Sequence, residues 1–318
     1  MEKIKFLYVS LLSSLLFSCN TTDETNTTPE CTQTAQINTS RGSCNESVAI
    51  SPKYSMTVSG GNRVIVANNI PNHKVGLFGS GSGSLNPNAI SAQNSTYTIT
   101  ASPTLASSLT SLLKTSGTGA GPQYSFGVLL NGVELDPVAA EPFPHKGMMA
   151  ANVNWEWNWE ATNISIGLDC NNAHVQPTGK YHYHGAPTLY LEGLNVQTNA
   201  MTLIGYAADG FPIYYKYAYT TATDSKSGVV EMKSSYRLKS GSRPGDGSTA
   251  PCGEYTGIYS NDYEYVAGLG TLDEANGRTG VTPEYPNGTY YYVITSAFPQ
   301  IPRYFKGTPS SSFKIGPK

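Results

Sequence analysis

The chain has 318 residues, of which 20 are basic and 22 acidic, so its formal net charge at pH 7 is −2. This balance offers no basic field for nucleic acid and excludes a nucleic-acid partner. Charged residues make up only 13% of the chain, and 32 glycines and 20 prolines stand beside many Ser, Thr, Asn and Tyr residues. Such a composition favours short strands joined by turns over long helices.

The start of the chain has the layout of an export signal. Lysines open it, and an apolar run from Ile4 to Phe17 follows that is too short to span a bilayer. The run ends in Leu16-Phe17-Ser18-Cys19, which resembles a bacterial lipobox. We therefore expect a signal peptide over residues 1–18 and a diacylated Cys19 that anchors the protein in the outer membrane, because two acyl chains give stable anchoring. A plain secretory peptide is the alternative.

The segment after Cys19 predicts a flexible tether. Residues 20–29 contain no apolar side chain that could be buried. We assign the tether to residues 19–47. The acidic residues close behind Cys19 weakly resemble a surface-export signal, which would place the cell-envelope domain outside the cell.

Four further cysteines predict two disulfides, because an even count is typical of proteins in an oxidising compartment. They are Cys31, Cys44, Cys170 and Cys252. Three connectivities are possible. Proximity in the sequence favours Cys31–Cys44 and, by elimination, Cys170–Cys252.

Residues 48–318 predict one mainly β domain, an antiparallel β-sandwich with one or two short helices. Short alternating runs separated by Gly, Asn and Pro turns indicate strands from residue 48 onward. Leucines at 105, 109, 112 and 113 have helical spacing and predict a short helix within residues 104–114. Residues 203–219 have the composition of a tight hairpin around Ala208-Asp209-Gly210.

Residues 154–160 alternate strictly between tryptophan and polar side chains. In a strand this pattern sets Trp155, Trp157 and Trp159 on one face and Glu160 on the other. We expect the tryptophans to face the core and Glu160 to lie on a solvated face. A platform that stacks on carbohydrate is the alternative for the tryptophans.

Three of the five histidines fall within eleven residues. His182 and His184 are two apart, so on a strand they project from the same face with Cα atoms about 6.6 Å apart. His174 lies upstream across a turn signal at residues 176–179 that could return it to the same place. Three neutral imidazoles with an open position are typical of catalytic zinc sites, and imidazole equally suits copper.

The sequence thus predicts a copper or zinc site at His174, His182 and His184, with Asp169 and Asp209 as orienting or ligating carboxylates behind it. Two alternatives remain for the histidines: a hydrogen-bonded polar strand face without metal, and a metal-free acid/base pair. Capping of turns is the alternative for the aspartates. His73 and His145 are expected to be ordinary surface residues. No Gly-x-Ser-x-Gly elbow, phosphate-binding loop or dinucleotide-binding glycine pattern is present in the sequence, and catalysis is left open.

One internal similarity bears on function. Residues 168–174 and 179–184 can be aligned with residues 272–278 and 288–293, and both copies read Leu-Asp, an Asn-containing loop, then Gly-x-Tyr-x-Tyr. The second copy has Tyr291 and Val293 where the first has His182 and His184. The alignment suggests a duplicated loop-and-strand unit in which one copy carries the chemistry and the other the scaffold, with a chance match as the rival interpretation.

The run from Leu168 to Gly185, which contains Tyr181-His182-Tyr183-His184, resembles the signature of the YHYH-domain family. Further matches lie at residues 204–214, 262–266, 272–278, 285–290 and 301–307, so the resemblance covers about residues 124–313. It implies an exported domain of largely unassigned activity. Family members commonly have cysteine where this chain has Ala275 and Tyr304, which implies that one family disulfide is missing here. Tyr291 likewise replaces a histidine often seen in the second copy.

Together these observations predict a cell-envelope lipoprotein that binds a transition metal. A metal-independent module for surface polysaccharide and a purely structural envelope protein are the alternatives.

Overall fold

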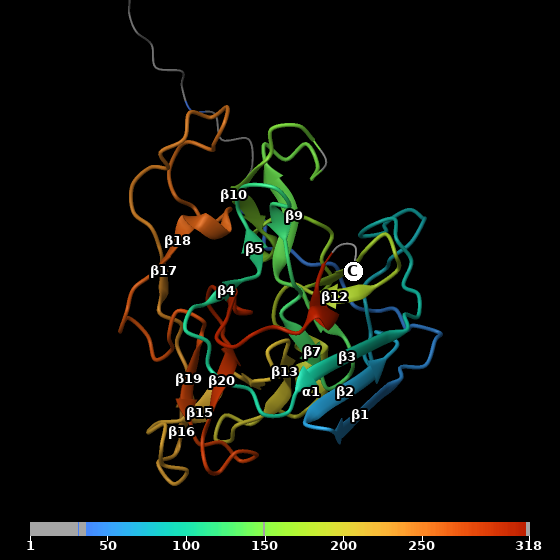
Figure 1. Cartoon of the computed structure of the whole chain (residues 1–318). Helices are drawn as coiled ribbons and strands as arrows, with labels where there is room; N and C mark the ends of the chain where they lie inside the picture. The colour runs from blue at the N-terminus through green and yellow to red at the C-terminus, as the bar shows by residue number, and fades with distance from the viewer. Residues whose placement is uncertain (1–30, 32–35, 149, 316–318) are drawn as a thin grey trace, which may run out of the picture. The chain divides into compact units, whose positions relative to one another are not determined.

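Short strands dominate the computed structural model, which describes residues 31, 36–148 and 150–315 (Figure 1). The predicted signal peptide, Cys19 and residues 20–30 lie outside these residues. The chain divides into residues 1–31 and residues 32–318, and the second unit is the one described below. The expectation of a mainly β fold with few helices is confirmed. Within the described ranges, no helix has the length and apolar character needed to cross a bilayer.

An eight-stranded sheet organises this unit. In spatial order its strands are β11 (Ala173–Val175), β12 (Tyr181–Tyr183), β8 (Glu134–Leu135), β7 (Gly127–Leu129), β13 (Leu203–Ala207), β14 (Pro212–Tyr215), β20 (Thr289–Ile294) and β19 (Gly277–Gly280). Neighbours run antiparallel except β12–β8 and β14–β20, which are parallel. The sheet is therefore mixed. The chain segment that connects the two strands of each parallel pair is long, so turn signals in the sequence do not predict this pairing.

The strand order repeats about the centre of the sheet, where β7 and β13 pair. Each half consists of an early hairpin (β7–β8 or β13–β14) and a later hairpin (β11–β12 or β19–β20). The last strand of each half, β12 or β20, pairs in parallel with the second strand of the early hairpin, β8 or β14. The loop entering the second hairpin is also the same, since Asn172 and Asn276 have φ angles of 53° and 55°. The hypothesis of a duplicated unit is thus confirmed at the level of hydrogen bonding and topology.

A smaller antiparallel sheet shares the main core. It consists of β1 (Tyr54–Ser59), β2 (Asn62–Ala67) and β3 (Ser95–Thr100). Ile65, Tyr97 and Ile99 from this sheet belong to the same apolar cluster as Tyr181 and Tyr292 from the large sheet. Two unequal sheets thus pack in a sandwich-like manner, and the apolar layer between them includes Tyr181 and Tyr183 of β12 and Tyr290 and Tyr292 of β20.

The remaining elements are short. The two-stranded pairs are β9 (Val138–Phe143) with β10 (Asn154–Glu160), β15 (Tyr217–Tyr219) with β16 (Val229–Glu231), β17 (Tyr236–Leu238) with β18 (Tyr263–Tyr265), β21 (Tyr304–Phe305) with β4 (Thr110–Ser111), and β5 (Leu113–Lys114) with β6 (Gly121–Pro122). The helical elements are α1 (Thr188–Gly193) and the 3-10 turns η1 (Ala161–Asn163), η2 (Ser260–Asp262) and η3 (Ser311–Phe313).

The predicted helix within residues 104–114 is wrong, because the chain forms β4 and β5 there. Leu112 is buried whereas Leu105 is 55% exposed. So short a segment depends on packing for its conformation, and the strands β21 and β6 supply that packing. The predicted hairpin is confirmed: β13 and β14 pair, and the amide of Gly210 donates to the carbonyl of Ala207 at 2.9 Å.

The predicted disulfide pairing is wrong. Cys44 pairs with Cys170, with Cα atoms 5.7 Å apart. Cys31 and Cys252 are disulfide-bonded as well, so neither Cys31–Cys44 nor Cys170–Cys252 forms. Proximity in the sequence misled because the path of the chain brings residue 44 to the loop before β11.

That path also corrects the tether. Residues 36–47 pack on the domain: the Asn38 amide donates to the Asn163 carbonyl at 2.9 Å, and Gly42 forms a bridge with Asp169. The Arg41 guanidinium donates to Asn172 Oδ1 and to the Thr162 carbonyl, each at 2.6 Å. The flexible tether predicted for residues 19–47 therefore does not extend over 36–47, because backbone and guanidinium hydrogen bonds fix a segment that lacks apolar anchors.

Candidate metal centre

The three histidines project from one face of the β11–β12 hairpin. His174 and His182 lie directly opposite each other in the antiparallel register, and His184 comes directly after β12, two residues beyond His182. Tyr181 and Tyr183 point to the opposite face, where both are fully buried in the main core. The alternation of a strand thus divides the Tyr-His-Tyr-His run into an anchor and a site.

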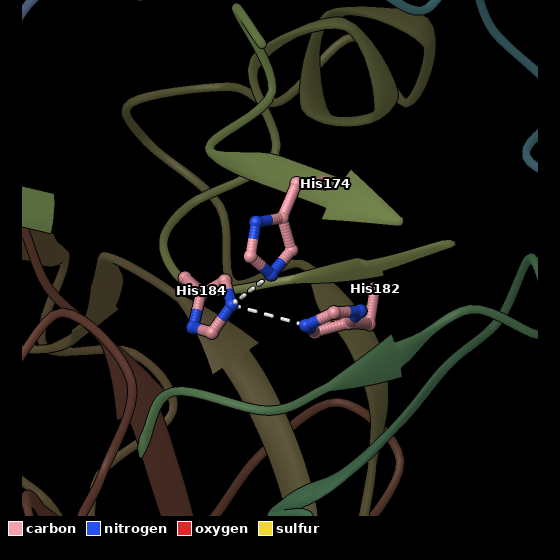
Figure 2. Close-up of side chains that lie close together, drawn as sticks. All are labelled: His174, His182 and His184. Atoms are coloured by element: carbon pink, nitrogen blue, oxygen red, sulfur yellow. Dashed lines mark hydrogen bonds between the residues drawn. The ribbon is translucent and has the colours of Figure 1, made fainter. Parts of the chain in front are cut away.

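The imidazoles converge through their Nε2 atoms (Figure 2). His182 Nε2 lies 3.0 Å from His184 Nε2, which lies 3.1 Å from His174 Nε2. Three nitrogens at about 2.0–2.1 Å from a tetrahedral zinc ion are about 3.3 Å apart, so small side-chain adjustments would place an ion between them. The three histidines can hold a metal ion, and the predicted convergence of His174, His182 and His184 is confirmed.

The other ring nitrogens show which atoms are free to ligate. His174 Nδ1 lies 3.0 Å from the carbonyl of Ile166, and a carbonyl only accepts, so this nitrogen carries the proton and leaves the Nε2 lone pair free. His182 Nδ1 is 3.4 Å from the carbonyl of Lys180, a weaker contact of the same kind. His184 Nδ1 is buried and makes no hydrogen bond of normal geometry within the described residues. Backbone carbonyls, which the sequence cannot reveal, therefore orient two of the rings.

Burial keeps the triad neutral. His182 is 2% exposed, His184 is 4% exposed and His174 is half-buried. Loss of solvent lowers the pKa of all three rings, and for His182 and His184 the neighbouring imidazoles lower the pKa further. Because an imidazole must be deprotonated to bind a metal, these shifts prepare the ligands at neutral pH. At most one proton can sit among the three Nε2 atoms, which leaves lone pairs that a cation would satisfy.

The two predicted carboxylates do not contact the triad. Asp169 is buried and accepts hydrogen bonds from Tyr181 Oη at 2.8 Å and from backbone amides, including that of Gly76 at 3.0 Å. Its charge raises the pKa of His174 only through space. Asp209 lies in the other half of the sheet and accepts from Tyr292 Oη at 2.5 Å and the Gly307 amide at 2.8 Å. Capping of the loops explains the contacts of both.

A cavity of about 1050 Å³ opens over the triad. The three histidines form one part of its lining, and Trp155, Trp159 and Ile166 supply apolar walls. Two carboxyls that the sequence did not single out, Asp136 and Glu141, also line it. They come from the end of β8 and from β9, some forty residues before the histidines, and carry no local motif.

The tryptophan stripe is mainly core, as predicted. Trp155 and Trp157 are 5% and 4% exposed, whereas Trp159 is half-buried. Irregular pairing of β10 with β9 breaks the alternation, so Glu160 is buried as well. Its expected solvated position is wrong, because Arg303 Nη2 donates to Glu160 Oε2 at 2.7 Å.

His73 and His145 are not ordinary surface residues, since both are half-buried. His73 Nε2 lies 2.7 Å from Tyr183 Oη. His145 stacks on Trp159 with ring centroids 3.9 Å apart, and its Nε2 lies 3.1 Å from Tyr259 Oη. Burial lowers the pKa of His145 to about 4, so this ring is neutral and serves packing.

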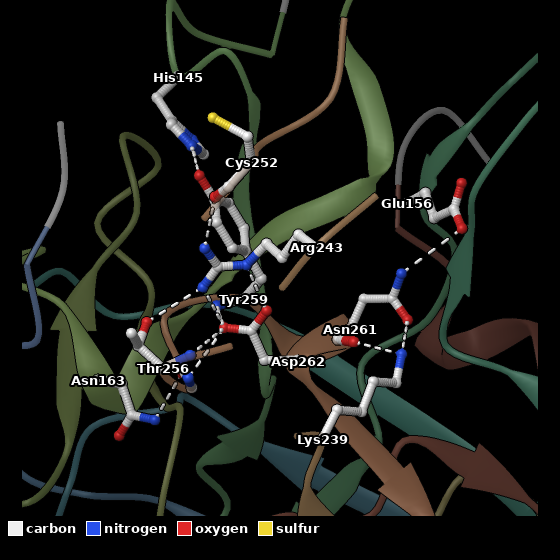
Figure 3. A network of polar contacts seen from close by, with 11 residues as sticks. His145, Glu156, Asn163, Lys239, Arg243, Cys252, Thr256, Tyr259, Asn261 and Asp262 are labelled. Carbon is white, nitrogen blue, oxygen red and sulfur yellow. Dashed lines mark hydrogen bonds and ion pairs between the residues drawn. The ribbon is translucent and has the colours of Figure 1, made fainter. Parts of the chain in front are cut away.

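A buried ion pair between Arg243 and Asp262 lies beside Tyr259 and His145 (Figure 3). Arg243 donates from Nε and Nη2 to the two carboxylate oxygens of Asp262, each at 2.7 Å, and its guanidinium lies 4.9 Å from the centre of the Tyr259 ring. The bidentate contact fixes Tyr259, which in turn contacts His145 behind Trp159. The aromatic wall is therefore held from behind rather than exposed as a free platform.

Fold and site together define a mainly β domain with a buried three-histidine cluster at the floor of a cavity. The profile described as "YHYH protein" matches residues 96–307, more than half of the chain, and the chain belongs to this family. No curated protein and no solved structure matches the chain.

Proposed function

We propose that this protein binds one transition-metal ion, copper or zinc, through the Nε2 atoms of His174, His182 and His184. The observation that carries the proposal is the convergence of three neutral imidazoles: His184 Nε2 lies 3.0 Å from His182 Nε2 and 3.1 Å from His174 Nε2, and one ligand atom from each of the three residues lies within 4.8 Å of the others. A hydrogen-bonded face without metal also brings nitrogens to about 3 Å, but it needs one N–H for each contact, and at most one proton can sit among these three atoms. The described residues instead leave lone pairs directed at one another.

The donor set favours these two metals. Imidazole nitrogen suits zinc and copper, whereas calcium requires oxygen ligands. Three protein ligands leave a tetrahedral ion one open position, and the cavity over the triad offers space for a water molecule or an external ligand there. A metal with such a position supplies Lewis-acid chemistry. The chain's own contribution is to bury the imidazoles, keep them neutral and orient them through the carbonyls of Ile166 and Lys180.

Metal content tests the proposal. The full chain without a tag, loaded with zinc or copper and then dialysed, should retain one equivalent by elemental analysis. The double variant His182→Ala/His184→Ala should retain none, and His145→Ala, which removes a half-buried histidine outside the triad, should retain one. Equal and negligible metal in all three proteins would refute the proposal, provided that circular dichroism shows them folded.

We also propose that the protein is exported and lipid-anchored through Cys19 in the outer membrane. The lipobox-like sequence supports the anchor, and the two disulfides suit an oxidising compartment. Palmitate labelling and membrane fractionation of Cys19→Ala against wild type test it. Loss of label and release from membranes are expected, and unchanged labelling would count against the anchor.

The polysaccharide-binding alternative has a narrower basis than the metal site. Of the three tryptophans Trp155 and Trp157 are buried and Trp159 is half-buried, and the ring of Trp159 is already stacked on His145. Glycan-array binding that survives both the triad substitutions and removal of metal would favour this alternative.

A further inference from the structure

The cavity over the triad has a marked charge character. Among the described residues that line it, the ionisable groups other than the histidines are Asp136 and Glu141, and both are acidic. No lysine or arginine belongs to that part of the lining. A phosphate or carboxylate ligand would therefore meet two carboxyls and no countercharge, apart from any metal ion at the triad.

Asp136 is built into the wall with an oxygen that lacks a partner. Its amide donates to the carbonyl of Tyr183 at 2.8 Å, which fixes the residue beside β12. The side chain is 5% exposed, and Oδ1 makes no hydrogen bond within the described residues. The other oxygen, Oδ2, has one long contact with Gln176 Nε2 at 3.5 Å. A buried carboxyl oxygen without a donor is costly, and a ligand donor in the cavity would remove that cost.

Glu141 presents a second oxygen of the same kind. It lies on β9 next to the aromatic wall, and Oε2 is buried without a hydrogen bond in the described ranges. Burial raises the pKa of Glu141, as it raises the pKa of Asp136, and for Asp136 the charges of Lys180 and Arg303 offset only part of this rise.

The cations closest to this region are already paired. Lys180 lies 3.0 Å from Glu134 and lines a separate polar cavity of about 360 Å³, which Asp136 also borders. Arg303 is paired with Glu160 at 2.7 Å. Neither side chain lines the triad cavity, so its two carboxyls remain available to a ligand.

We propose that this cavity binds an organic ammonium ion with an apolar body. The ammonium group donates to Asp136 Oδ1 and Glu141 Oε2, and the body packs between Trp155, Trp159 and Ile166, where the two tryptophan rings also attract cations. The volume suits a molecule of drug-like size. This inference goes beyond metal binding, because the two carboxyls hold the ligand whether or not a metal ion is present.

A series of probes with one body and three charges tests the inference. We would titrate the metal-free full chain, by calorimetry, with 2-phenylethylamine, 2-phenylethanol and phenylacetate. The amine should bind at least about tenfold more tightly than the alcohol, and phenylacetate should bind more weakly than both, because the cavity is acidic. Comparable affinity for amine and carboxylate, or no saturable binding of any probe, would overturn the proposal.

Two variants locate the binding groups. Asp136→Asn and Glu141→Gln should each weaken amine binding about tenfold and change alcohol binding less than about twofold. Glu156→Gln, which changes an exposed carboxyl on β10 outside this cavity, serves as the matched control. Amine affinity unchanged in both cavity variants would overturn the assignment. Zinc content measured on the same proteins keeps the two proposals separate. A protein that binds the amine but no zinc would refute only the metal proposal, and one that binds zinc but no amine would refute only this inference.

Discussion

The two halves of the large sheet share a backbone and differ in what fills the space above it. In the first half, His174 faces His182 across the β11–β12 hairpin; in the second, Arg278 faces Tyr291 across β19–β20. Arg278 Nε donates to Tyr291 Oη at 2.6 Å. The first half thus has imidazole lone pairs that converge. At the equivalent place the second half has a hydrogen bond between Arg278 and Tyr291.

The packing beside these residues differs in the same way. Asp136, which lines the cavity, directly follows Leu135, the partner of Tyr183. In the second half, Tyr214 occupies the position equivalent to Asp136, and it pairs with Val293. In the second half an apolar cluster occupies this face of the sheet, and its buried members are Met201, Tyr214, Ala218, Met232, Leu272, Tyr291 and Val293. One scaffold therefore supports either a polar cavity or a packed core, and a few side chains decide which of them forms.

Grafting residues of the second half into the first should have the largest effect. His182→Tyr/His184→Val copies side chains that the equivalent strand already accommodates. Zinc affinity should fall at least about a thousandfold, because two of three ligands are lost. Competition with a chelator measures this fall. Affinity within tenfold of wild type would place the metal elsewhere. If the wild-type protein bound no metal and the variant unfolded, the structural-protein alternative would be favoured.

The disulfide marks a second difference between the halves. Cys170 lies in the first loop and is bonded to Cys44, whereas Glu274 stands at the equivalent position. Cys44→Ser/Cys170→Ser should lower the free energy of unfolding by about 4–5 kcal/mol, because the bond closes a loop of more than a hundred residues. Urea unfolding measures this loss. Hydrogen exchange should accelerate in residues 169–173 and stay unchanged in residues 273–277. Equal acceleration in both loops would contradict the claim that the disulfide stabilises the first loop alone.

Asp136, in the first half, predicts a dependence of stability on pH that extends to higher pH than the one expected from Asp209 in the second half, whose pKa burial raises to about 6. Burial, followed by the charge of Glu134, raises the pKa of Asp136 from 3.8 to about 7. The folded state then holds a proton that the unfolded state releases, so this group's contribution to stability declines as pH rises from about 4 to 7. Asp136→Asn should remove that decline and gain on the order of 3 kcal/mol relative to wild type over this interval. Parallel unfolding-versus-pH curves would rule this out.

The smallest expected effects separate the two loop anchors. Tyr181 Oη donates to Asp169 at 2.8 Å, and Tyr290 Oη donates to Asp273 at 2.9 Å. Asp169 is buried, whereas the Asp273 side chain is 32% exposed and can bind water instead. Tyr181→Phe should therefore cost about 2 kcal/mol and Tyr290→Phe about 1 kcal/mol. Urea unfolding measures the loss in the free energy of unfolding of each variant. A larger loss in Tyr290→Phe than in Tyr181→Phe would contradict the prediction.

Local patterns in the sequence carried much of this picture. The two-residue spacing of His182 and His184 predicted a common face, and the repeated Leu-Asp and Tyr-x-Tyr segments predicted the duplication, because strand alternation and loop capping depend on neighbours in the sequence. Both predictions hold in the structure.

Features that depend on the path of the chain could not be predicted. The Cys44–Cys170 pair follows from residues 36–47 lying along the domain, and the cavity gains Asp136 and Glu141 from strands distant in sequence. Leucine spacing failed within residues 104–114 because packing against β6 and β21 outweighed a weak helical pattern. The carboxylates chosen for the site, Asp169 and Asp209, are loop anchors, since capping uses the same residue type as metal chemistry.

X-ray absorption at the zinc edge of the zinc-loaded protein tests the central claim most directly. Coordination through the triad predicts three imidazole nitrogens at about 2.0–2.1 Å and one further light atom. A shell that contains sulfur at about 2.3 Å, or oxygen atoms without imidazole scattering, would show that His174, His182 and His184 do not hold the ion.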